Sequence, residues 1–505
     1  MATFRPRRWT PDLGLWTIIA LAAAVRLAFA LRPPPFITPD SQGYFLPGWE
    51  LAHGLGFGPE LRRTPTYPLF IGLVVFLLGD DLRGLTLAQH GLGVLTAGLT
   101  YTLGRRAFGR LAGLLAGFAV ALSGPLLIYE HTLMTEALFT LLVTLAVLMA
   151  LLALRRPTRD RLLAAGLALA AASLTRPVAE VLLPLLPLAL LAHHRAWRPA
   201  LRETAWFGLG LGLLFLPWMA RNALAHGTFS AEGALGQALI GRTVRHDDYR
   251  KFYRCPTDGQ VGAGDSRPAD SLAPPQDGAL GIICEEAVGE PSGGTITQRV
   301  RDELGLSQTE TSNVLRQLAI AAIARRPAYY LTGSFKMAGE ILVGKRETVI
   351  APWRERTTRN WDNKWDPRLT PLVQHPPPAE GPEYERADAL VSFFQPFRWR
   401  TQLGQLLALG LLAAVARPSW RPALIVPIAA GAIVLASAAL DGNVWRYRYP
   451  VDPLLAVTVG GGGQALRLAG AWIVRQLTTA AGGRRPAATA EARRPEPAAV
   501  VERGA

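Results

Sequence analysis

The sequence predicts an all-α polytopic membrane protein, a bundle of about ten transmembrane helices with juxtamembrane helices and an outer domain. Half of its 505 residues are hydrophobic and only 18% are charged, which is more apolar content than one soluble core needs. A helix needs about 20 apolar residues to cross the hydrocarbon, and runs of that length recur along the chain. Arginine and lysine gather in short clusters between these runs, which is the charge pattern of membrane topology.

The formal net charge of +15 does not indicate a nucleic-acid partner. The basic residues of the chain are distributed between apolar segments instead of forming one basic module. The first apolar run, Leu13 to Leu31, lacks a small-residue cleavage site and is followed by many similar runs. We therefore expect a retained transmembrane helix there and not a signal peptide.

The apolar runs also predict the topology. The expected spans are residues 13–31, 83–104, 111–128, 137–154, 161–175, 178–194, 203–220, 401–416, 422–440 and 452–474. Basic clusters occupy every second connection between them, which places both termini in the cytoplasm. The expected location is the cell (inner) membrane, crossed many times.

Four parts follow from this arrangement. They are a transmembrane module of about seven helices (1–222), an extracytoplasmic domain (223–400), further transmembrane helices (401–475) and a disordered cytoplasmic tail (476–505). Tyr67 to Gly79 is short for a span and predicts a juxtamembrane or re-entrant helix. Residues 314–344 predict an interfacial helix, in which Tyr329 and Tyr330 would anchor at the lipid headgroups.

Ionisable residues cluster in the short loops of the predicted outer face. The first loop holds Pro39 to Tyr44 and Arg62 to Pro68, and the second holds Tyr129 to Glu136. Arg176 lies at a later outer turn, and Arg446 to Pro450 precedes the last span. Carboxylates and guanidiniums are therefore expected at one membrane surface.

This inventory suits glycosyl transfer from a lipid-linked phosphate sugar. The leaving phosphate needs cations, and arginine offers a bidentate fork. Asp40 would take the proton of an acceptor hydroxyl, and Glu136 would orient the acceptor, share the base role or bind a metal. The chain has no phosphate loop ending in lysine and no GxGxxG motif after a strand, which disfavours a nucleotide donor.

These residues resemble those of the GT-C glycosyltransferases, specifically the dolichyl-phosphate-mannose protein mannosyltransferase and aminoarabinose transferase group (family 39-like). In that group an acidic residue follows the first helix, an Arg-Pro-x-Tyr-Pro-like motif opens a juxtamembrane helix, and a second acidic residue opens the fourth span. Asp40, the segment Arg63 to Pro68 and Glu136 match these features. This chain inserts Thr64 between Arg63 and Pro65, and Arg62 competes with Arg63 for the same role.

The resemblance implies a GT-C type bundle that transfers a monosaccharide from a polyprenyl-phosphate carrier to a lipid, glycan or protein acceptor, with inversion. Membrane lipids are the other expected partners. No cofactor is certain, and a divalent metal stays an open alternative. The implied residues are Asp40 and Glu136 for catalysis, Arg63, Tyr67, Arg62, Arg446 and Tyr447 for the donor phosphate, and Tyr44, Glu130, His131 and Arg176 for substrate contacts.

Each of these residues also has a purely structural interpretation. Asp40 could cap the next helix, and Glu136 could meet the positive end of its own helix. Arg26, near the outer end of the first span, is expected to reach the interface by snorkelling. The run Gly460 to Gly463 favours close helix packing over a phosphate loop. Cys255 and Cys284 are expected to form a disulfide if their segment lies outside the cell.

Two other function classes compete with glycosyl transfer. A transporter or lipid flippase would also be polytopic, but would place ionisable residues near the membrane midplane and would show two related halves. A non-catalytic scaffold would not need paired acids and arginines in short loops. The distribution of charges favours the enzyme.

Overall fold

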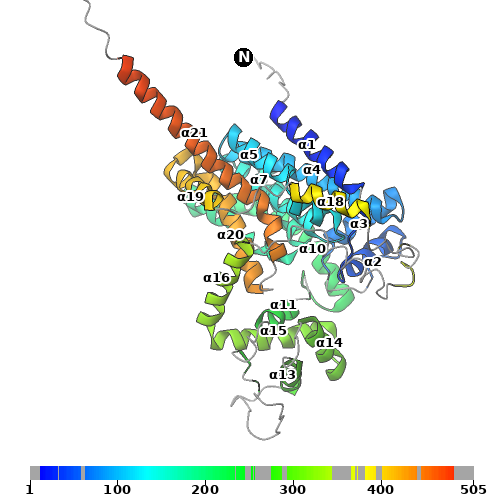
Figure 1. The fold of residues 1–505 in the computed structure, drawn as a ribbon. Helices are drawn as coiled ribbons and strands as arrows, with labels where there is room; N and C mark the ends of the chain where they lie inside the picture. Colours follow the sequence, from blue (N-terminus) through cyan, green and yellow to red (C-terminus); the bar gives the residue numbers. More distant parts are fainter. Residues whose placement is uncertain are drawn as a thin grey trace, which may run out of the picture. The chain divides into compact units, whose positions relative to one another are not determined.

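The computed structural model describes residues 12–31, 33–58, 63–231, 233, 235–244, 252–253, 255, 274–286, 293–343, 366–369, 372, 381–393, 401–440 and 445–482 (Figure 1). Every named element in these ranges is a helix, which confirms the all-α class. The chain divides into two compact units, Met1–Gln464 and Ala465–Ala505. In the second unit the described residues continue the last helix and are mostly exposed.

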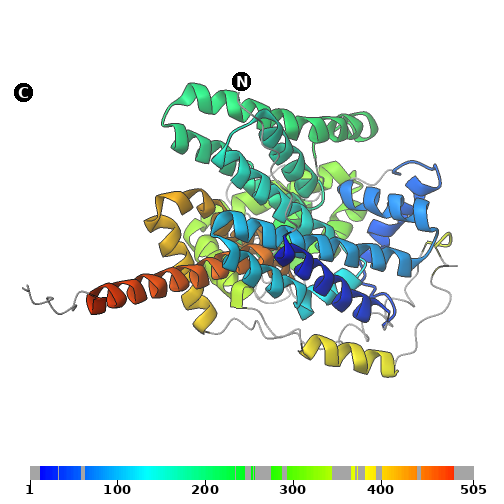
Figure 2. The ribbon, with the colours of Figure 1, turned by 90° about the horizontal axis from the view of Figure 1, so that it is seen from above.

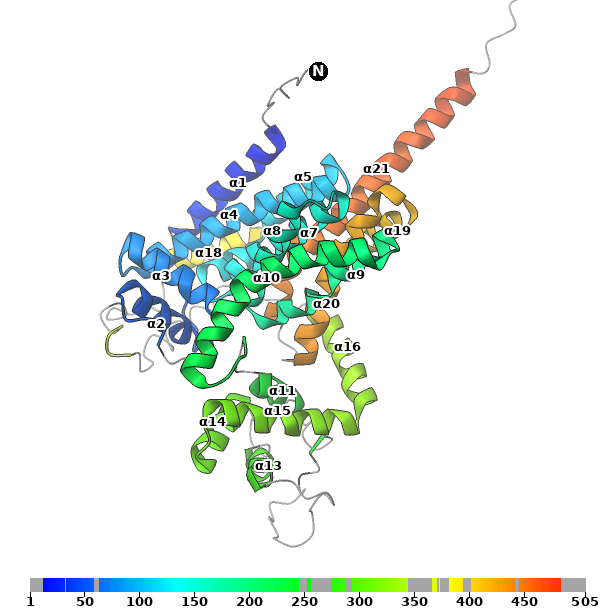
Figure 3. The same ribbon diagram turned by 180° about the vertical axis from the view of Figure 1, so that it is seen from behind.

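The N-terminal part of the first unit is a helical bundle. Its elements are α1 (Leu13–Ala30), α2 (Ser41–Ala52), α3 (Thr66–Leu78), α4 (Leu82–Ala107), α5 (Arg110–Ala121), α6 (Gly124–His131), α7 (Glu136–Arg155), α8 (Arg159–Ser173), the 3-10 helix η1 (Pro177–Leu182), α9 (Leu185–His194) and α10 (Trp197–His226). The short helices α2 and α3 pack together at one end of this bundle (Figure 2). Helix α10 runs along α8 and α9 (Figure 3).

The C-terminal part of the bundle follows a long intervening region. It contains α19 (Thr401–Ala416), η4 (Pro418–Leu424), α20 (Ile425–Leu440), η5 (Trp445–Val451) and α21 (Asp452–Gly482). Five helical segments of the described chain are long and apolar enough to cross a membrane, namely α1, α7, η1 with α9, α10, and η4 with α20. The protein is therefore an integral membrane protein, whereas the full count of about ten spans stays a prediction.

One expected span differs from a straight helix. Residues 111–128 divide into α5 and α6, which are bent by 51° and would make a sixth span if they cross together. The cause is local. Ser123 accepts a hydrogen bond from the backbone N–H of Leu126, and Pro125 occupies the first turn of α6, so a new helix starts there.

Glycines set how closely the helices approach. A Cβ atom on Gly166 of α8 would lie 2.1 Å from the carbonyl oxygen of Phe207 on α10. A Cβ atom on Gly462 of α21 would lie 2.1 Å from the carbonyl oxygen of Leu406 on α19. Larger side chains would force these backbones apart. The Gly460 to Gly463 run therefore serves helix packing, as the sequence predicts.

The region between the two parts of the bundle contains a second hydrophobic core. Helices α11 (Leu235–Val244), α13 (Pro274–Glu286), α14 (Gly293–Leu304) and α15 (Gln308–Arg325) bury their apolar faces against one another. Helix α16 (Pro327–Val343) follows α15 in the chain and packs against α20 (Figures 1 and 3). Helix α18 (Pro382–Phe393) packs instead against α6.

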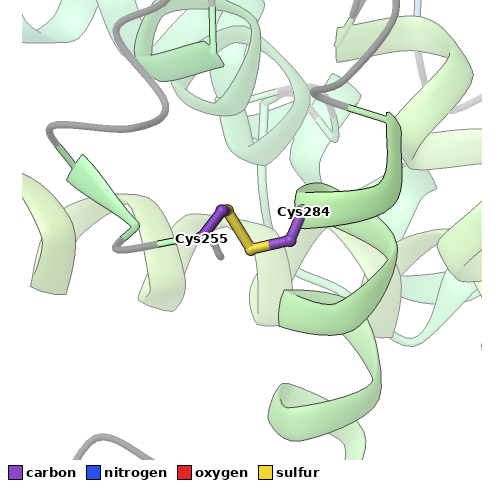
Figure 4. Close-up of a disulfide and its surroundings, with 2 residues drawn as sticks. All are labelled: Cys255 and Cys284. Atoms are coloured by element: carbon purple, nitrogen blue, oxygen red, sulfur yellow. A yellow bond between two sulfur atoms is a disulfide. The ribbon is translucent and has the colours of Figure 1, made fainter. Parts of the chain in front are cut away.

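The sequence makes two predictions for this region, one about two tyrosines and one about two cysteines. The stretch 314–344 is divided between α15 and α16, which are separated at Arg326, and Tyr329 and Tyr330 on α16 pack against the second core. Their role as headgroup anchors stays a prediction. The Tyr330 hydroxyl donates a hydrogen bond to the carbonyl oxygen of Ala439 at 2.6 Å. Cys255 and Cys284 are joined by a disulfide (Figure 4).

The disulfide provides the first prediction. It connects residues 29 positions apart, and a closed loop of that length restricts the unfolded chain. We expect the double change Cys255→Ser with Cys284→Ser to lower the free energy of unfolding of this region by about 2–4 kcal/mol. Thermal unfolding of the purified protein in detergent, followed by proteolysis of the region, measures this loss.

Reductant is the control for this measurement. It should lower the stability of the wild type to that of the double variant and leave the variant unchanged. Complete thiol labelling of both cysteines in denatured, non-reduced wild type would contradict the assignment.

Candidate active site

The first and second predicted outer loops are joined by backbone hydrogen bonds. The N–H of Phe36 donates to the carbonyl oxygen of His131 at 3.0 Å, and the N–H of Leu133 donates to the carbonyl oxygen of Phe36 at 3.0 Å. These bonds form a short parallel bridge between the two loops. The segments that carry Asp40 and Glu136 are thereby held at fixed positions relative to each other.

The start of α3 is tied to a third loop in the same way. The N–H of Thr66 donates to the carbonyl oxygen of Leu174 at 3.1 Å, and the hydroxyl of Thr64 donates to that of Thr175 at 3.1 Å. Thr64 follows Arg63, and Thr175 precedes Arg176. The residue inserted into the Arg-Pro motif thus joins the two loops that carry these arginines.

Asp40 lies at the start of α2 and pairs with Arg63. The Nη2 atom of Arg63 is 2.8 Å from Oδ1 of Asp40, in a pair whose acid side chain is 36% exposed. Within the described chain the carboxylate does not cap α2, so the capping interpretation is not realised. The guanidinium also lies 4.1 Å above the ring centroid of Tyr44.

Tyr67, which contacts Tyr44, is wholly buried. Its ring meets that of Tyr44 edge to face at 5.4 Å, and its hydroxyl donates to Oε1 of Gln89 at 2.6 Å. The hydroxyl proton of Tyr67 is therefore already used in this hydrogen bond, and Tyr67 supports the Asp40–Arg63 pair through its contact with Tyr44. Arg62, the competing arginine, lies outside the described residues.

Glu136 opens α7 and lies between two arginines. Its Oε1 atom accepts a hydrogen bond from Nη1 of Arg176 at 2.9 Å and lies 3.9 Å from Nε of Arg446. The carboxylate is 1% exposed. Among the described residues, Oε2 of Glu136 and Nε of Arg446 have no hydrogen-bond partner. Buried polar atoms of this kind are usually satisfied, so both are available to a ligand.

Tyr447 contacts both arginines. The Arg176 guanidinium lies 4.7 Å from the centroid of the Tyr447 ring, and that of Arg446 lies 5.4 Å from it. Cation–π contacts of this kind hold two like charges near one carboxylate. Tyr447 thus positions Arg176 and Arg446 for a common anionic ligand.

Glu130 and His131 belong to a different, fully buried network. Nη2 of Arg26 is 2.8 Å from Oε1 of Glu130, and Nδ1 of His90 is 3.1 Å from Oε2 of the same carboxylate. His90 Nε2 then hydrogen-bonds His131 Nδ1 at 3.0 Å. The snorkelling interpretation of Arg26 is wrong, because its side chain is 1% exposed and points to Glu130 across the helix interface.

The far end of this network contacts the first loop. His131 Nε2 lies 3.1 and 3.0 Å from the carbonyl oxygens of Pro33 and Pro34, which only accept hydrogen bonds. This nitrogen therefore carries a proton, and the bond between His131 Nδ1 and His90 Nε2 needs a second proton on one of these two nitrogens. A direct substrate contact by Glu130 or His131, as the resemblance implies, would require this network to open.

Sequence reasoning did not identify Gln89 and His90. Gln89 accepts from Tyr67 and donates its two amide protons to the carbonyl oxygens of Glu130 and Thr132, each at 2.9 Å. It thus links α3, α4 and the second loop. Two adjacent polar residues inside the predicted span 83–104 were the available signal, since polar groups in a membrane helix need partners.

A small cavity is lined by two carboxylates, one from each of the networks described above. Glu130 and Glu136 both line it, together with Thr96 and Thr140. Gly93 lies at its edge, where an added Cβ would lie 2.2 Å from Oε1 of Glu130. A glycine is therefore required for α4 to pass beside this carboxylate.

The acids of the site are neutralised by arginines. In the described ranges, no three His, Cys, Asp or Glu side chains gather in a way that could hold a metal ion. Asp40 and Glu136 each face a guanidinium instead. The arrangement is suited to binding a phosphate or another anion by displacement of a carboxylate.

One family model matches part of the chain. Residues 62–220 match the family model described as dolichyl-phosphate-mannose-protein mannosyltransferase. This segment contains the Arg63 to Pro68 motif, Glu136 and Arg176. The match confirms the resemblance to the GT-C, family 39-like glycosyltransferases, and it supports glycosyl transfer as the general activity.

Two solved structures are similar to the chain at low identity. ArnT from Cupriavidus metallidurans bound to undecaprenyl phosphate is 15% identical, with a TM-score of 0.36 over 89% of this chain and 78% of that chain. AglB from Archaeoglobus fulgidus, in complex with an inhibitory peptide and a dolichol-phosphate, is 14% identical, with a TM-score of 0.44 over 95% of this chain and 53% of that one. At these scores neither gives a residue correspondence. No curated protein matches the sequence.

The buried ion pair provides the second prediction. Glu130→Gln keeps the shape of the side chain but leaves Arg26 buried without its counter-charge, which should cost about 3–5 kcal/mol of unfolding free energy. Denaturation in detergent measures the loss. Asp160→Asn, which removes an exposed carboxylate at the start of α8, should change stability by less than about 1 kcal/mol. Wild-type stability in Glu130→Gln would contradict the assigned pair.

Proposed function

We propose that this protein transfers a monosaccharide from a polyprenyl-phosphate carrier to an acceptor at the outer face of the membrane. The observation that supports this most is that Glu136 and Arg446 each have a buried atom without a hydrogen-bond partner among the described residues. Both lie by Arg176, whose loop is joined to that of Arg63 by the Thr64–Thr175 hydrogen bond. Three guanidiniums (Arg63, Arg176 and Arg446) face two carboxylates there, so the local charge favours an anionic ligand.

The donor phosphate is the anion that we assign to this site. Arg446 is 28% exposed and pairs only distantly with Glu136, so its guanidinium is the most available of the three. Arg63 would contribute from the other side when it leaves Asp40. Positive charge beside the phosphate stabilises the negative charge that develops as the bond from the sugar to the phosphate breaks.

The Asp40–Arg63 pair gives a reason for the donor to bind before Asp40 acts as a base. In the structure, Asp40 is held by Arg63 at 2.8 Å. A donor phosphate competes for the guanidinium and releases the carboxylate. Asp40 is then available to accept a proton only when the leaving group is already bound, which limits transfer to a loaded enzyme.

Transfer proceeds by displacement at the anomeric carbon. The acceptor oxygen forms a bond to this carbon as the bond to the phosphate oxygen breaks, and Asp40 takes the proton of an acceptor hydroxyl. Attack opposite to the leaving group inverts the configuration. If the acceptor is itself a phosphate, no base is needed and Asp40 positions it. Lipid, glycan and protein acceptors are all compatible with this chemistry.

The location of the reaction rests on topology. The charge pattern places both termini in the cytoplasm and the loops of Asp40 and Glu136 outside, in the cell (inner) membrane. The disulfide between Cys255 and Cys284 supports an oxidising environment for the residue 223–400 region.

A transporter or lipid flippase is the alternative. One observation favours it, because the Arg26–Glu130–His90 network lies inside the bundle, where transporters often carry ionisable groups. Failure of the purified protein to transfer sugar from every polyprenyl-phosphate donor would favour this alternative.

The third prediction separates chemistry from donor binding. In purified protein in lipid, Asp40→Asn should reduce transfer of radiolabelled sugar from polyprenyl-phosphate donors to a hydroxyl acceptor by about 100-fold or more. Donor binding should be retained or tightened, because Arg63 loses a competing carboxylate. Asp160→Asn serves as the matched control. Full activity of Asp40→Asn would remove Asp40 as the base.

The fourth prediction concerns the phosphate. Arg446→Ala should weaken donor binding by about tenfold or more, because a charge-assisted hydrogen bond is lost. Arg446→Lys should restore only part of it, since an ammonium group lacks the planar fork. Arg386→Ala, at an exposed position on α18, is the control. Unchanged donor affinity in Arg446→Ala would exclude this arginine from the phosphate site.

A further inference from the structure

A separate cleft lies between α15 and the segment that follows α10. It has a volume of about 240 Å³, just below the range of roughly 300–1,000 Å³ that pockets for drug-sized ligands occupy, so it suits a smaller ligand. Hydroxyl, amide, guanidinium and aromatic side chains line it, namely those of Thr228, Phe229, Thr309, Ser312, Asn313 and Arg316. None of them belongs to the site of Asp40 and Glu136.

One wall of the cleft is a polar stripe on α15. Thr309, Ser312, Asn313 and Arg316 follow the i, i+3, i+4, i+7 spacing that places side chains on one helix face. The opposite face of α15 is buried in the second core. Ser312 accepts a hydrogen bond from the N–H of Gly236 at 3.3 Å and so helps to fix α11.

Two side chains of this stripe have polar groups that can bind a ligand. Within the described ranges, Asn313 and Arg316 make no hydrogen bond or ion pair. The guanidinium group of Arg316 and the carboxamide of Asn313, which line the cleft, are therefore available to a ligand.

The opposite wall is held rigidly by α10. The Asn222 amide donates to the carbonyl oxygen of Ser230 at 2.8 Å, and the Trp218 indole N–H donates to that of Ala231 at 2.9 Å. Phe229 directly precedes these two anchored residues in the chain, and it is 60% exposed. An aromatic ring is thus presented to the cleft on a fixed backbone.

The same anchors connect the cleft to the first outer loop. The Trp218 ring contacts Phe57 edge to face at 5.0 Å, and Arg221 donates to the carbonyl oxygen of Gly58. This loop follows α2, whose first residue is adjacent to Asp40. A ligand in the cleft therefore lies on the same side of the bundle as the candidate active site.

We infer that this cleft binds a saccharide, and that the acceptor of the reaction carries one. A pyranose ring has an apolar face that packs on an aromatic ring and a rim of hydroxyl groups that hydrogen-bond amide, hydroxyl and guanidinium groups. Phe229 provides the platform, and Asn313 and Arg316 provide the polar contacts. This role as an acceptor subsite rests on the proposed function, whereas saccharide binding itself does not.

Direct binding tests the inference without any transfer assay. The full-length protein in lipid nanodiscs is applied to an array of defined neutral, carboxylated and phosphorylated oligosaccharides, and the best binder is titrated in solution. We expect Phe229→Ala and Arg316→Ala each to weaken its affinity by about tenfold, the effect of losing one good contact. Phe335→Ala (63% exposed) and Arg325→Ala, at the exposed last residue of α15 and away from the cleft, should leave the affinity unchanged.

The outcomes separate the two proposals. No binding to any array member, or unchanged affinity in both cleft variants, overturns the saccharide site. Binding that is lost in the cleft variants while no donor supports transfer keeps the site and contradicts the proposed function. Where transfer occurs, a raised KM for the acceptor with unchanged kcat in the cleft variants supports the acceptor role. Comparison of the same saccharide free and attached to a lipid identifies the form that binds.

Discussion

The ion pair between Arg26 and Glu130 is the interaction on which the other parts of the bundle depend. Both side chains are almost completely buried, and the guanidinium also donates to the carbonyl oxygen of Ala121 at 3.1 Å, where α5 ends. Removing two charges from water is costly unless geometry and further hydrogen bonds compensate. Here His90 and two backbone carbonyls complete the network, so α1, α4, α5 and α6 have one favourable relative arrangement.

This arrangement determines where the outer loops can lie. His131 extends the network to the carbonyl oxygens of Pro33 and Pro34, and Gln89 on the neighbouring position of α4 binds the second loop and Tyr67. The chain thus uses buried polar contacts to place Asp40 and Glu136. Of these two acids, Asp40 is accessible and Glu136 is enclosed, which suits a proton acceptor and a fixed electrostatic element respectively.

Much of the fold could be predicted because hydrophobic length and basic flanks are local properties of the sequence. The same is true of the segment Thr66–Leu78, whose prolines and short apolar run indicated a separate helix. The partner of Arg26 could not be predicted, since a guanidinium near the end of a span has the same sequence pattern whether it faces lipid or another helix. The pairing of Glu136 with Arg176, 40 residues away, likewise depends on how α7 and α8 pack. The contact of Tyr329 and Tyr330 with the second core could not be predicted, because aromatic residues suit an interface and a small core equally well.

The contact between Gly93 and Glu130 links two positions through both volume and charge. The carboxylate occupies the space that a side chain at position 93 would fill, and Arg26 and His90 hold it there. A chain with alanine at 93 could therefore keep the ion pair only with an acid one methylene shorter at 130, or with a shifted α4. A side chain at position 93 is thus compatible with the ion pair only if the residue at position 130 changes with it.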